Sequence, residues 1–259
     1  MDNPIHMQEV LFTRDGTPIT GEWYTPAGAA APYPAVILSH GFADCMDGTR
    51  AFARGLAQAG FAACIFDFIG GSLQSRSGGS MQDMSVLTEA ADLDAVIRGV
   101  LEIPEADPDR LFLLGASQGG FVSTYAAARH PEVRGLVLLF PAYVLQEDAR
   151  KRVSAPGYVP GECRIMGQPV GAVYDRDALS FDIFDSIRAF DRPVLLLHGT
   201  ADTIVPISWS ERASDTFPDA RLVVIPDAGH GFTGADERTA LDAVTEFLRR
   251  ITENGGEDL

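Results

Sequence analysis

Cysteine is scarce in this sequence of 259 residues. Cys45, Cys64 and Cys163 are odd in number, are widely separated and lack the spacing of metal ligands. Neither a disulfide framework nor a cysteine-based metal site is therefore indicated. Basic residues are also few, because 20 lysines and arginines stand against 36 aspartates and glutamates, for a formal net charge of −16. This balance argues against nucleic acid and anionic membrane surfaces as partners.

Long apolar runs are absent as well. No run approaches the length of about 18 residues that crosses a bilayer, and the first residues lack the basic and then apolar pattern of a secretory signal peptide. We therefore expect a cytoplasmic protein. Hydrophobic residues make up 46% of the chain and can fill one large core. The sequence predicts a single domain over residues 1–259 and leaves the oligomeric state open, with a homodimer as one alternative.

Short apolar runs alternate with helical patterns along most of the chain. Two runs, at 9–13 and 18–24, flank an Asp-Gly turn and predict a hairpin. Six later runs show no alternation of apolar and polar residues, which is typical of strands buried on both faces of a parallel sheet. These runs lie at 35–38, 61–66, 111–114, 136–140, 194–197 and 222–225. The expected helices lie near 50–59, 86–102, 121–129, 208–216 and 237–252. The pattern predicts an α/β fold, a mostly parallel twisted sheet with helices on both faces.

Residues 141–180 interrupt this alternation. The segment follows the sixth expected strand, contains Pro156, Pro160 and Pro169, and shows no long periodic element. In a compact domain, an irregular stretch of this length is usually a lid or a binding element. Its place after a strand puts it over the carboxyl ends of the strands, where open α/β sheets bind ligands. We expect it to be a lid, or cap, insertion.

The most specific motif is Gly-Ala-Ser-Gln-Gly at residues 115–119, which lies between a strand pattern and a helix pattern. In that setting Gly-x-Ser-x-Gly is typical of a nucleophile elbow, a strained turn that projects the serine hydroxyl above the sheet. Larger side chains in place of the two glycines would collide with the neighbouring strand and helix. The motif indicates Ser117 as a nucleophile. A serine that only caps the following helix is the alternative.

A serine hydroxyl needs a base to take its proton, and the base needs a third group to orient it. His230 lies between two glycines in the loop after the last expected strand, where the chain order Ser–Asp–His requires the base. Asp202 follows the strand at 194–197 and is the expected acid. Asp227 is too close to His230 along the chain to approach it easily. Asp236 is expected at the start of the last helix, in solvent.

An oxyanion intermediate needs at least two fixed hydrogen-bond donors. The backbone N–H of Gln118, directly after the candidate nucleophile, is the first, with the dipole of the following helix behind it. The second is expected from the loop after the strand at 35–38, which begins His40-Gly41-Phe42. Gly41 would let the chain turn so that the Phe42 N–H faces the serine. The side chain of His40 is expected to be structural.

With these motifs, the chain resembles the α/β-hydrolase superfamily over nearly its whole length. The matching stretches are 40–42, 115–119, 198–202 and 229–230. Within the superfamily the sequence is most similar to the bacterial feruloyl (cinnamoyl) esterases, through the Ser-Gln-Gly-Gly ending of the elbow and the stretches at 66–68 and 84–89. It departs from them at Ala116, where that group commonly has histidine, and in its longer turn at 69–79.

The resemblance implies two substrate-binding residues. In those esterases a carboxylate early in the cap and a tyrosine midway along it hydrogen-bond the substituents of a phenolic ring, and Asp148 and Tyr174 stand at these positions. A charged solvated turn at Asp148 and simple packing of Tyr174 are the alternatives. The resemblance also implies a serine esterase that acts through an acyl-enzyme on feruloyl or caffeoyl esters. No metal or organic cofactor is indicated, because no ligand cluster occurs in the sequence.

Three other functions remain open. The first is a general short-chain carboxylesterase, and the second is an oligopeptidase-like serine hydrolase, which shares the order of the catalytic residues. Such peptidases usually carry a propeller or another large gating domain, which this sequence lacks. The third is a hydrolase-fold receptor that binds a small ligand without turnover. The presence of Ser117, Asp202 and His230 together argues against this third function.

Overall fold

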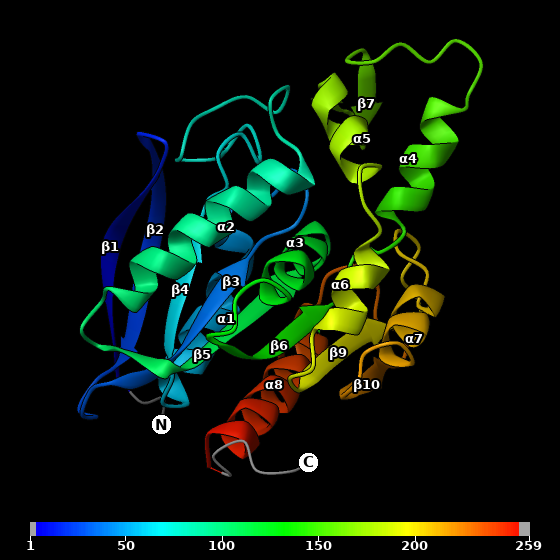
Figure 1. Cartoon of the computed structure of the whole chain (residues 1–259). Coiled ribbons are helices and arrows are strands. Elements are labelled where there is room, and N and C mark those ends of the chain that lie inside the picture. Colours follow the sequence, from blue (N-terminus) through cyan, green and yellow to red (C-terminus); the bar gives the residue numbers. More distant parts are fainter. Residues whose placement is uncertain (1–3, 254–259) are drawn as a thin grey trace.

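The structure is a computed structural model, and it describes residues 4–253. Its centre is an eight-stranded sheet in the order β1-β2-β4-β3-β5-β6-β9-β10 (Figure 1). The strands are β1 (Ile5–Arg14), β2 (Thr17–Pro26), β3 (Tyr33–Ser39), β4 (Ala62–Phe66), β5 (Ala106–Ala116), β6 (Val133–Leu139), β9 (Val194–Gly199) and β10 (Ala220–Ile225). The hairpin of β1 and β2 is antiparallel and joins β4 in antiparallel pairing, while all later neighbours are parallel. The predicted mostly parallel sheet is thus confirmed.

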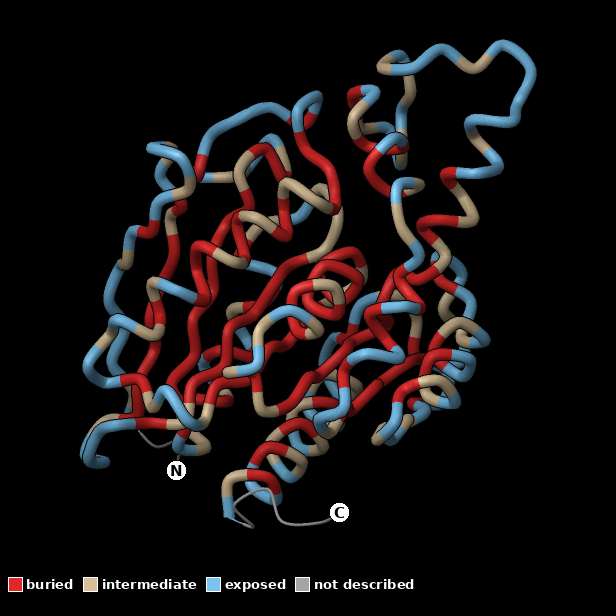
Figure 2. The backbone as a smooth tube through the Cα atoms, in the orientation of Figure 1, coloured by how far each residue is buried: buried red, intermediate tan, exposed pale blue. Residues whose placement is uncertain are grey.

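Helices cover both faces of this sheet. They are α1 (Arg50–Gln58), which follows the 3-10 helix η1 (Met46–Thr49), and α2 (Val86–Leu101), α3 (Gln118–Ala127), α6 (Ile183–Ala189), α7 (Ser208–Ser214) and α8 (Ala235–Glu253). On β3, Ile37 packs in the apolar cluster that contains α2, α3, α6 and α7, whereas Val36 and Leu38 pack in the cluster of α1 and α8. The central strands are therefore buried on both sides (Figure 2), which explains why their sequences are apolar without alternation.

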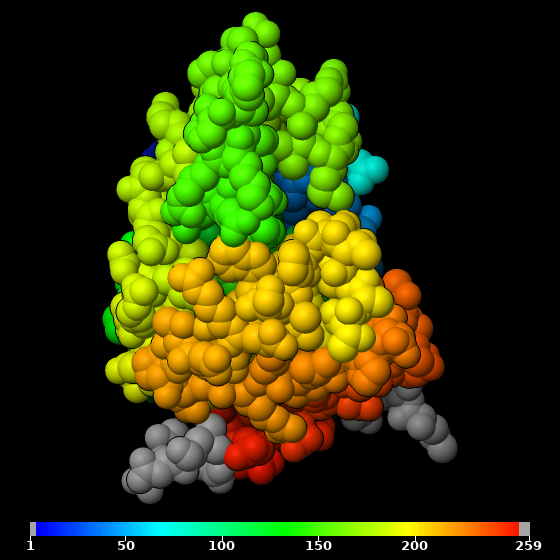
Figure 3. Space-filling model, turned by 90° about the vertical axis from the view of Figure 1, so that its right-hand side faces the viewer, coloured from blue at the N-terminus to red at the C-terminus, as the bar shows by residue number. Residues whose placement is uncertain are grey.

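Residues 141–180 lie beyond one end of the strands, where they form the top of the molecule in the orientation of Figures 1 and 3. The segment contains α4 (Leu145–Val153), the two-stranded antiparallel sheet of β7 (Cys163–Ile165) and β8 (Gln168–Val170), and α5 (Ala172–Ala178). The sequence predicted no long periodic element here, so α4 corrects it. The nine-residue helix buries only Leu145, Gln146 and Ala149, and three positions are too few to give a clear helical period.

Within residues 4–253, no helix is both long and apolar enough to cross a membrane.

Candidate active site

Ser117 lies at the turn from β5 into α3, with φ 53° and ψ −119°. A positive φ is uncommon for a residue with a side chain and marks a strained turn. Two close approaches surround the turn, since a Cβ at Gly115 would lie 2.3 Å from the carbonyl oxygen of Gly119, and one at Gly119 would lie 2.4 Å from that of Ser39. Both glycines of the motif are therefore required by packing. The Ser117 carbonyl also accepts a hydrogen bond from the Ala142 N–H at 2.9 Å.

Three side chains from three different loops form one hydrogen-bonded chain. Nε2 of His230 lies 3.0 Å from Ser117 Oγ, and Nδ1 of the same ring lies 2.7 Å from Asp202 Oδ2. The other carboxylate oxygen of Asp202 accepts hydrogen bonds from the N–H groups of Ile204 and Val205, both at 2.9 Å. The structure thus brings together the three residues that the sequence proposed as nucleophile, base and acid. Asp202, and not a competing carboxylate, contacts the imidazole.

A second histidine, His198, also contacts this carboxylate. Its Nε2 lies 2.9 Å from the Val205 carbonyl oxygen and 3.2 Å from Asp202 Oδ2, and its Nδ1 lies 2.7 Å from Ser210 Oγ. Both groups near Nε2 can only accept, so Nε2 carries the proton and the Ser210 hydroxyl donates to Nδ1. Burial lowers the pKa of His198, which favours this neutral form. No role was assigned to His198 from the sequence, although it lies only four residues before Asp202.

The two proposed oxyanion donors flank the Ser117 turn. A Cβ at Gly41 would lie 3.2 Å from Ser117 Cβ, so the loop that carries Phe42 runs directly beside the serine. Gln118 is the first residue of α3, where backbone N–H groups have no partner within the helix. Neither the Phe42 nor the Gln118 N–H donates a hydrogen bond to another group in residues 4–253. Both are therefore available to an oxygen bound at Ser117.

His40, beside this loop, is buried and neutral. Its Nε2 accepts a hydrogen bond from the Phe68 N–H at 3.2 Å, so its Nδ1 donates to the Gly41 carbonyl oxygen at 2.9 Å. Burial lowers the pKa of the ring. Both nitrogens are used to hold the loop, and neither contacts the serine.

The two residues that the resemblance assigns to the substrate lie on the two helices of the 141–180 segment. Asp148, on α4, is half-buried, and its carboxylate has no hydrogen-bond partner within residues 4–253. Tyr174, on α5, is buried, and its hydroxyl donates to Gln118 Oε1 at 2.6 Å. Its ring meets that of Phe42 edge-on, with 5.7 Å between the centroids. Burial raises the pKa of Tyr174, so its hydroxyl stays protonated.

Glu89, on α2, is a buried group that the sequence did not single out for a role. Its Oε2 accepts a hydrogen bond from Gln118 Nε2 at 2.8 Å, while Oε1 has no partner within the described residues. Burial, helped by the negative charge of Asp92 and opposed by the Gln118 hydrogen bond, raises the pKa of Glu89 to about 8. Glu89 is therefore mostly a neutral carboxylic acid at pH 7.

This raised pKa predicts how the stability of the protein depends on pH. Between the ordinary pKa of 4.5 and the folded value of about 8, the unfolded chain releases the Glu89 proton and the folded chain keeps it. The contribution of Glu89 to stability is therefore complete below pH 4.5 and falls as the pH rises toward 8. Glu89→Gln, which has no proton to lose, should raise the melting temperature more at pH 8.5 than at pH 5.

The measurement is thermal unfolding at both pH values, with Glu246→Gln as the control because Glu246 is exposed on α8. An equal change at both pH values in Glu89→Gln would show that Glu89 ionises normally in the folded protein.

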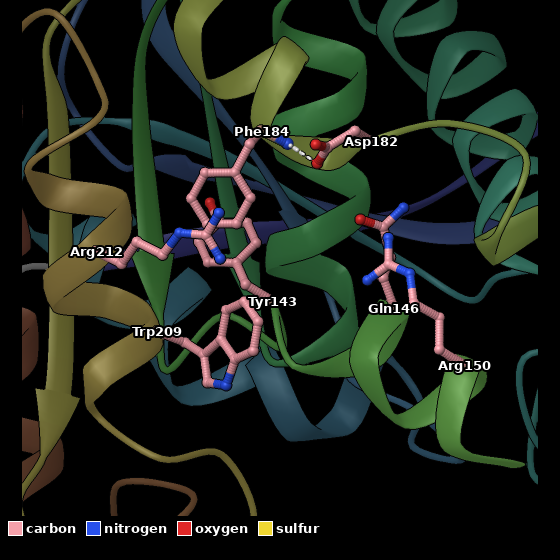
Figure 4. Close-up of a pocket in the computed structure, with 7 residues that line it drawn as sticks. All are labelled: Tyr143, Gln146, Arg150, Asp182, Phe184, Trp209 and Arg212. Carbon is pink, nitrogen blue, oxygen red and sulfur yellow. Dashed lines mark hydrogen bonds between the residues drawn. The ribbon is translucent and has the colours of Figure 1, made fainter.

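A separate pocket lies where α4, α6 and α7 meet (Figure 4). Tyr143 and Trp209 line it, and the guanidinium groups of Arg150 and Arg212 enter it from α4 and α7. Ser117 does not line this pocket. Within residues 4–253, no group of three or more His, Cys, Asp or Glu side chains could hold a metal ion.

Comparison with known proteins agrees with this geometry. Residues 30–168 match the family model described as serine aminopeptidase, S33, and residues 177–257 match a model described as TAP-like protein. Est1E from Butyrivibrio proteoclasticus, whose structure holds ferulic acid, superposes with a TM-score of 0.85 and 25% identity, over 93% of this chain and 98% of that one.

Two curated relatives have no assigned activity. Rv2307c of Mycobacterium tuberculosis is 29% identical over 95% of this chain and 80% of its own length. YfhR of Escherichia coli K12 is 26% identical over 88% of this chain and 75% of its own length. The first family model covers more than half of the sequence, and the sheet order and the strained serine turn agree with it. The chain therefore belongs to the serine aminopeptidase S33 family of the α/β-hydrolases.

Proposed function

We propose that this protein is a serine esterase that cleaves hydroxycinnamoyl esters, such as those of ferulic and caffeic acid, through an acyl-enzyme. The observation that carries the proposal is the unbroken chain from Ser117 Oγ through the His230 ring to Asp202. It ends at a serine with a positive φ, beside a turn where the N–H groups of Phe42 and Gln118 donate to no other group within residues 4–253. A nucleophile, a base, an orienting acid and oxyanion donors are the groups that acyl transfer needs.

Each residue has one role in the reaction. Ser117 Oγ attacks the ester carbonyl carbon as His230 Nε2 takes its proton, and the N–H groups of Phe42 and Gln118 bind the resulting oxyanion. The tetrahedral intermediate collapses, and His230 returns the proton to the leaving alcohol. His230 then activates a water molecule, which attacks the ester carbon on Ser117 and releases the acid. Asp202 keeps the proton on Nδ1 throughout and stabilises the imidazolium.

The substrate class rests on the 141–180 segment, which we propose acts as a cap over the acyl group. Est1E, a solved structure 25% identical to this chain, holds ferulic acid. In the present chain Asp148 offers a half-buried carboxylate that has no hydrogen-bond partner within residues 4–253, an acceptor suited to a phenolic hydroxyl. The Tyr174 and Phe42 rings lie against each other beside the serine loop, and they would form an apolar wall for an aromatic acyl group.

A two-step experiment tests the reaction and then the substrate. A fluorophosphonate probe should label wild-type protein at Ser117, which mass spectrometry of the labelled peptide would locate. Hydrolysis rates are then compared for p-nitrophenyl acetate, methyl ferulate, methyl caffeate, chlorogenate and a peptide amide. We expect the highest kcat/KM on the hydroxycinnamoyl esters and no cleavage of the peptide. Absence of labelling would contradict an enzyme, and a preference for acetate would indicate a general short-chain carboxylesterase.

Asp148→Asn tests how the phenolic end is recognised. A hydrogen bond to a charged group contributes about 1.5–3 kcal/mol, and asparagine keeps an acceptor without the charge. We therefore expect kcat/KM on methyl caffeate to fall by about 10-fold, with p-nitrophenyl acetate unaffected because its acyl group is too short to reach the cap. The control is Glu147→Gln, on the same helix, where Glu147 pairs with Lys151 at the surface. Equal losses on both esters would mean that Asp148 only supports the fold.

A further inference from the structure

Tyr174 of the cap touches both residues that carry the oxyanion donors. Its ring lies edge-on to Phe42, and its hydroxyl is committed to Gln118 Oε1 at 2.6 Å. All three side chains are wholly or partly buried. A tyrosine whose only role was to bind the phenolic end of a substrate would keep its hydroxyl free for that substrate, so this geometry points to another role.

The side chain of Gln118 is held at both ends of its amide. Tyr174 donates to Oε1, and Nε2 donates to Glu89 at 2.8 Å and lies 3.7 Å from the sulfur of Met84. Only 1% of the residue is exposed. The Gln118 N–H shares a peptide plane with the Ser117 carbonyl, which accepts hydrogen bonds from Gly120, Phe121 and Ala142. The side-chain bonds of Gln118 hold the same residue from its other side, and so add to the constraint on the direction of its N–H.

The position of Tyr174 follows from the docking of α5 against the chain before α2. A Cβ at Gly171, which precedes α5, would lie 1.8 Å from the Gln82 carbonyl oxygen, so the two backbones are in direct contact. At the other end of the helix, the buried Ser85 hydroxyl donates to Asp177 at 2.6 Å. A shift of α5 would break these contacts and, at the same time, move the Tyr174 hydroxyl away from Gln118.

We propose that Tyr174 and Glu89 are positioning residues that clamp Gln118 from opposite sides, so that the seating of the cap helix α5 sets the orientation of the oxyanion donor and thereby the reactivity of Ser117. This inference rests on the proposed function. It adds that the cap contributes to catalysis for every ester, including those too small to touch the cap.

The test compares two tyrosines that each bond a residue of α3. Tyr174→Phe removes the bond to Gln118 and keeps the ring, whereas the control Tyr143→Phe removes an equally buried bond of 2.7 Å to Thr124. Steady-state kinetics on p-nitrophenyl acetate should show kcat reduced about 10-fold in Tyr174→Phe with KM unchanged, less than the loss of about 100-fold or more when an oxyanion donor is removed outright. Tyr143→Phe should keep the wild-type kcat.

A trifluoromethyl ketone provides a second readout, because its adduct with the serine carries an oxyanion. Its Ki should rise by the same factor as kcat falls in Tyr174→Phe. It should rise at least as much in Gln118→Met, which keeps the backbone N–H but loses the bonds to both Tyr174 and Glu89. The double variant should lose no more than Gln118→Met alone, because that change already removes the Tyr174 bond.

Three results would overturn the clamp. The first is an equal kcat in Tyr174→Phe and Tyr143→Phe, and the second is an additive loss in the double variant. The third is a Tyr174→Phe defect confined to hydroxycinnamoyl esters, which would return Tyr174 to substrate recognition. A wild-type protein without labelling or turnover would instead overturn the proposed function, so the two failures are distinguishable.

Discussion

Ser117→Ala is expected to lower kcat of ester hydrolysis by about a million-fold, the scale seen when a serine hydrolase loses its nucleophile. The change removes one oxygen from a partly exposed turn and leaves the fold intact. Alanine also has to adopt φ 53°, which costs no more for it than for serine because both have a Cβ. The melting temperature should therefore stay near the wild-type value, and the loss should be chemical.

Matched measurements separate chemistry from folding. Ser123→Ala removes a fully buried hydroxyl from the same helix, one that has no hydrogen-bond partner within residues 4–253, and it should retain full activity. Both variants are followed by kcat and by thermal unfolding. If Ser117→Ala kept more than a few per cent of the wild-type rate, another residue would have to be the nucleophile.

Asp202→Asn should lower kcat by about 10,000-fold. The reason lies in the four donors around the carboxylate, two backbone N–H groups at Oδ1 and the rings of His230 and His198 at Oδ2. An asparagine keeps its oxygen toward the two N–H groups, which cannot accept, so its NH₂ faces His230. Nδ1 must then accept a hydrogen bond, and the proton moves to Nε2, the atom that has to receive the proton of Ser117.

The kinetic control is Asp227→Asn, the competing carboxylate in the sequence, which is exposed and forms no bond with His230. It should be active at the wild-type level. Severe loss in Asp227→Asn with little change in Asp202→Asn would reassign the acid.

Much of the fold could be predicted because its signals are local in the sequence. The central stretches of the parallel sheet at 35–38, 111–114, 136–139 and 194–197 are buried on both faces and are therefore apolar at every position. The elbow could be predicted because Gly115 and Gly119 have no room for a side chain. The order of the three loops that carry Ser117, Asp202 and His230 follows from the order of the strands. These features need no knowledge of how distant segments meet.

The parts of the site and fold that the sequence did not predict depend on contacts between segments that are distant along the chain. Tyr174 bonds a residue 56 positions away, and Glu89 one 29 positions away, so neither contact leaves a pattern along the chain. The helix α6 was not predicted because its seven residues complete only two turns. α4 was missed because most of its surface is charged and faces solvent.

The hydrogen bond from Ala142 to the carbonyl of Ser117 bears on how this enzyme could be re-engineered. The segment at 141–180 forms two hydrogen bonds with the elbow. The Ala142 N–H donates to Ser117 just after β6, and the Tyr174 hydroxyl donates to Gln118 from α5. A chimera that imports only residues 145–170 of a relative keeps both contacts and changes the residues between them. Exchange of the whole segment at 141–180 replaces both residues that form these contacts. A chimera made to test the proposed role of this segment in substrate choice is therefore best joined between Ala142 and Tyr174.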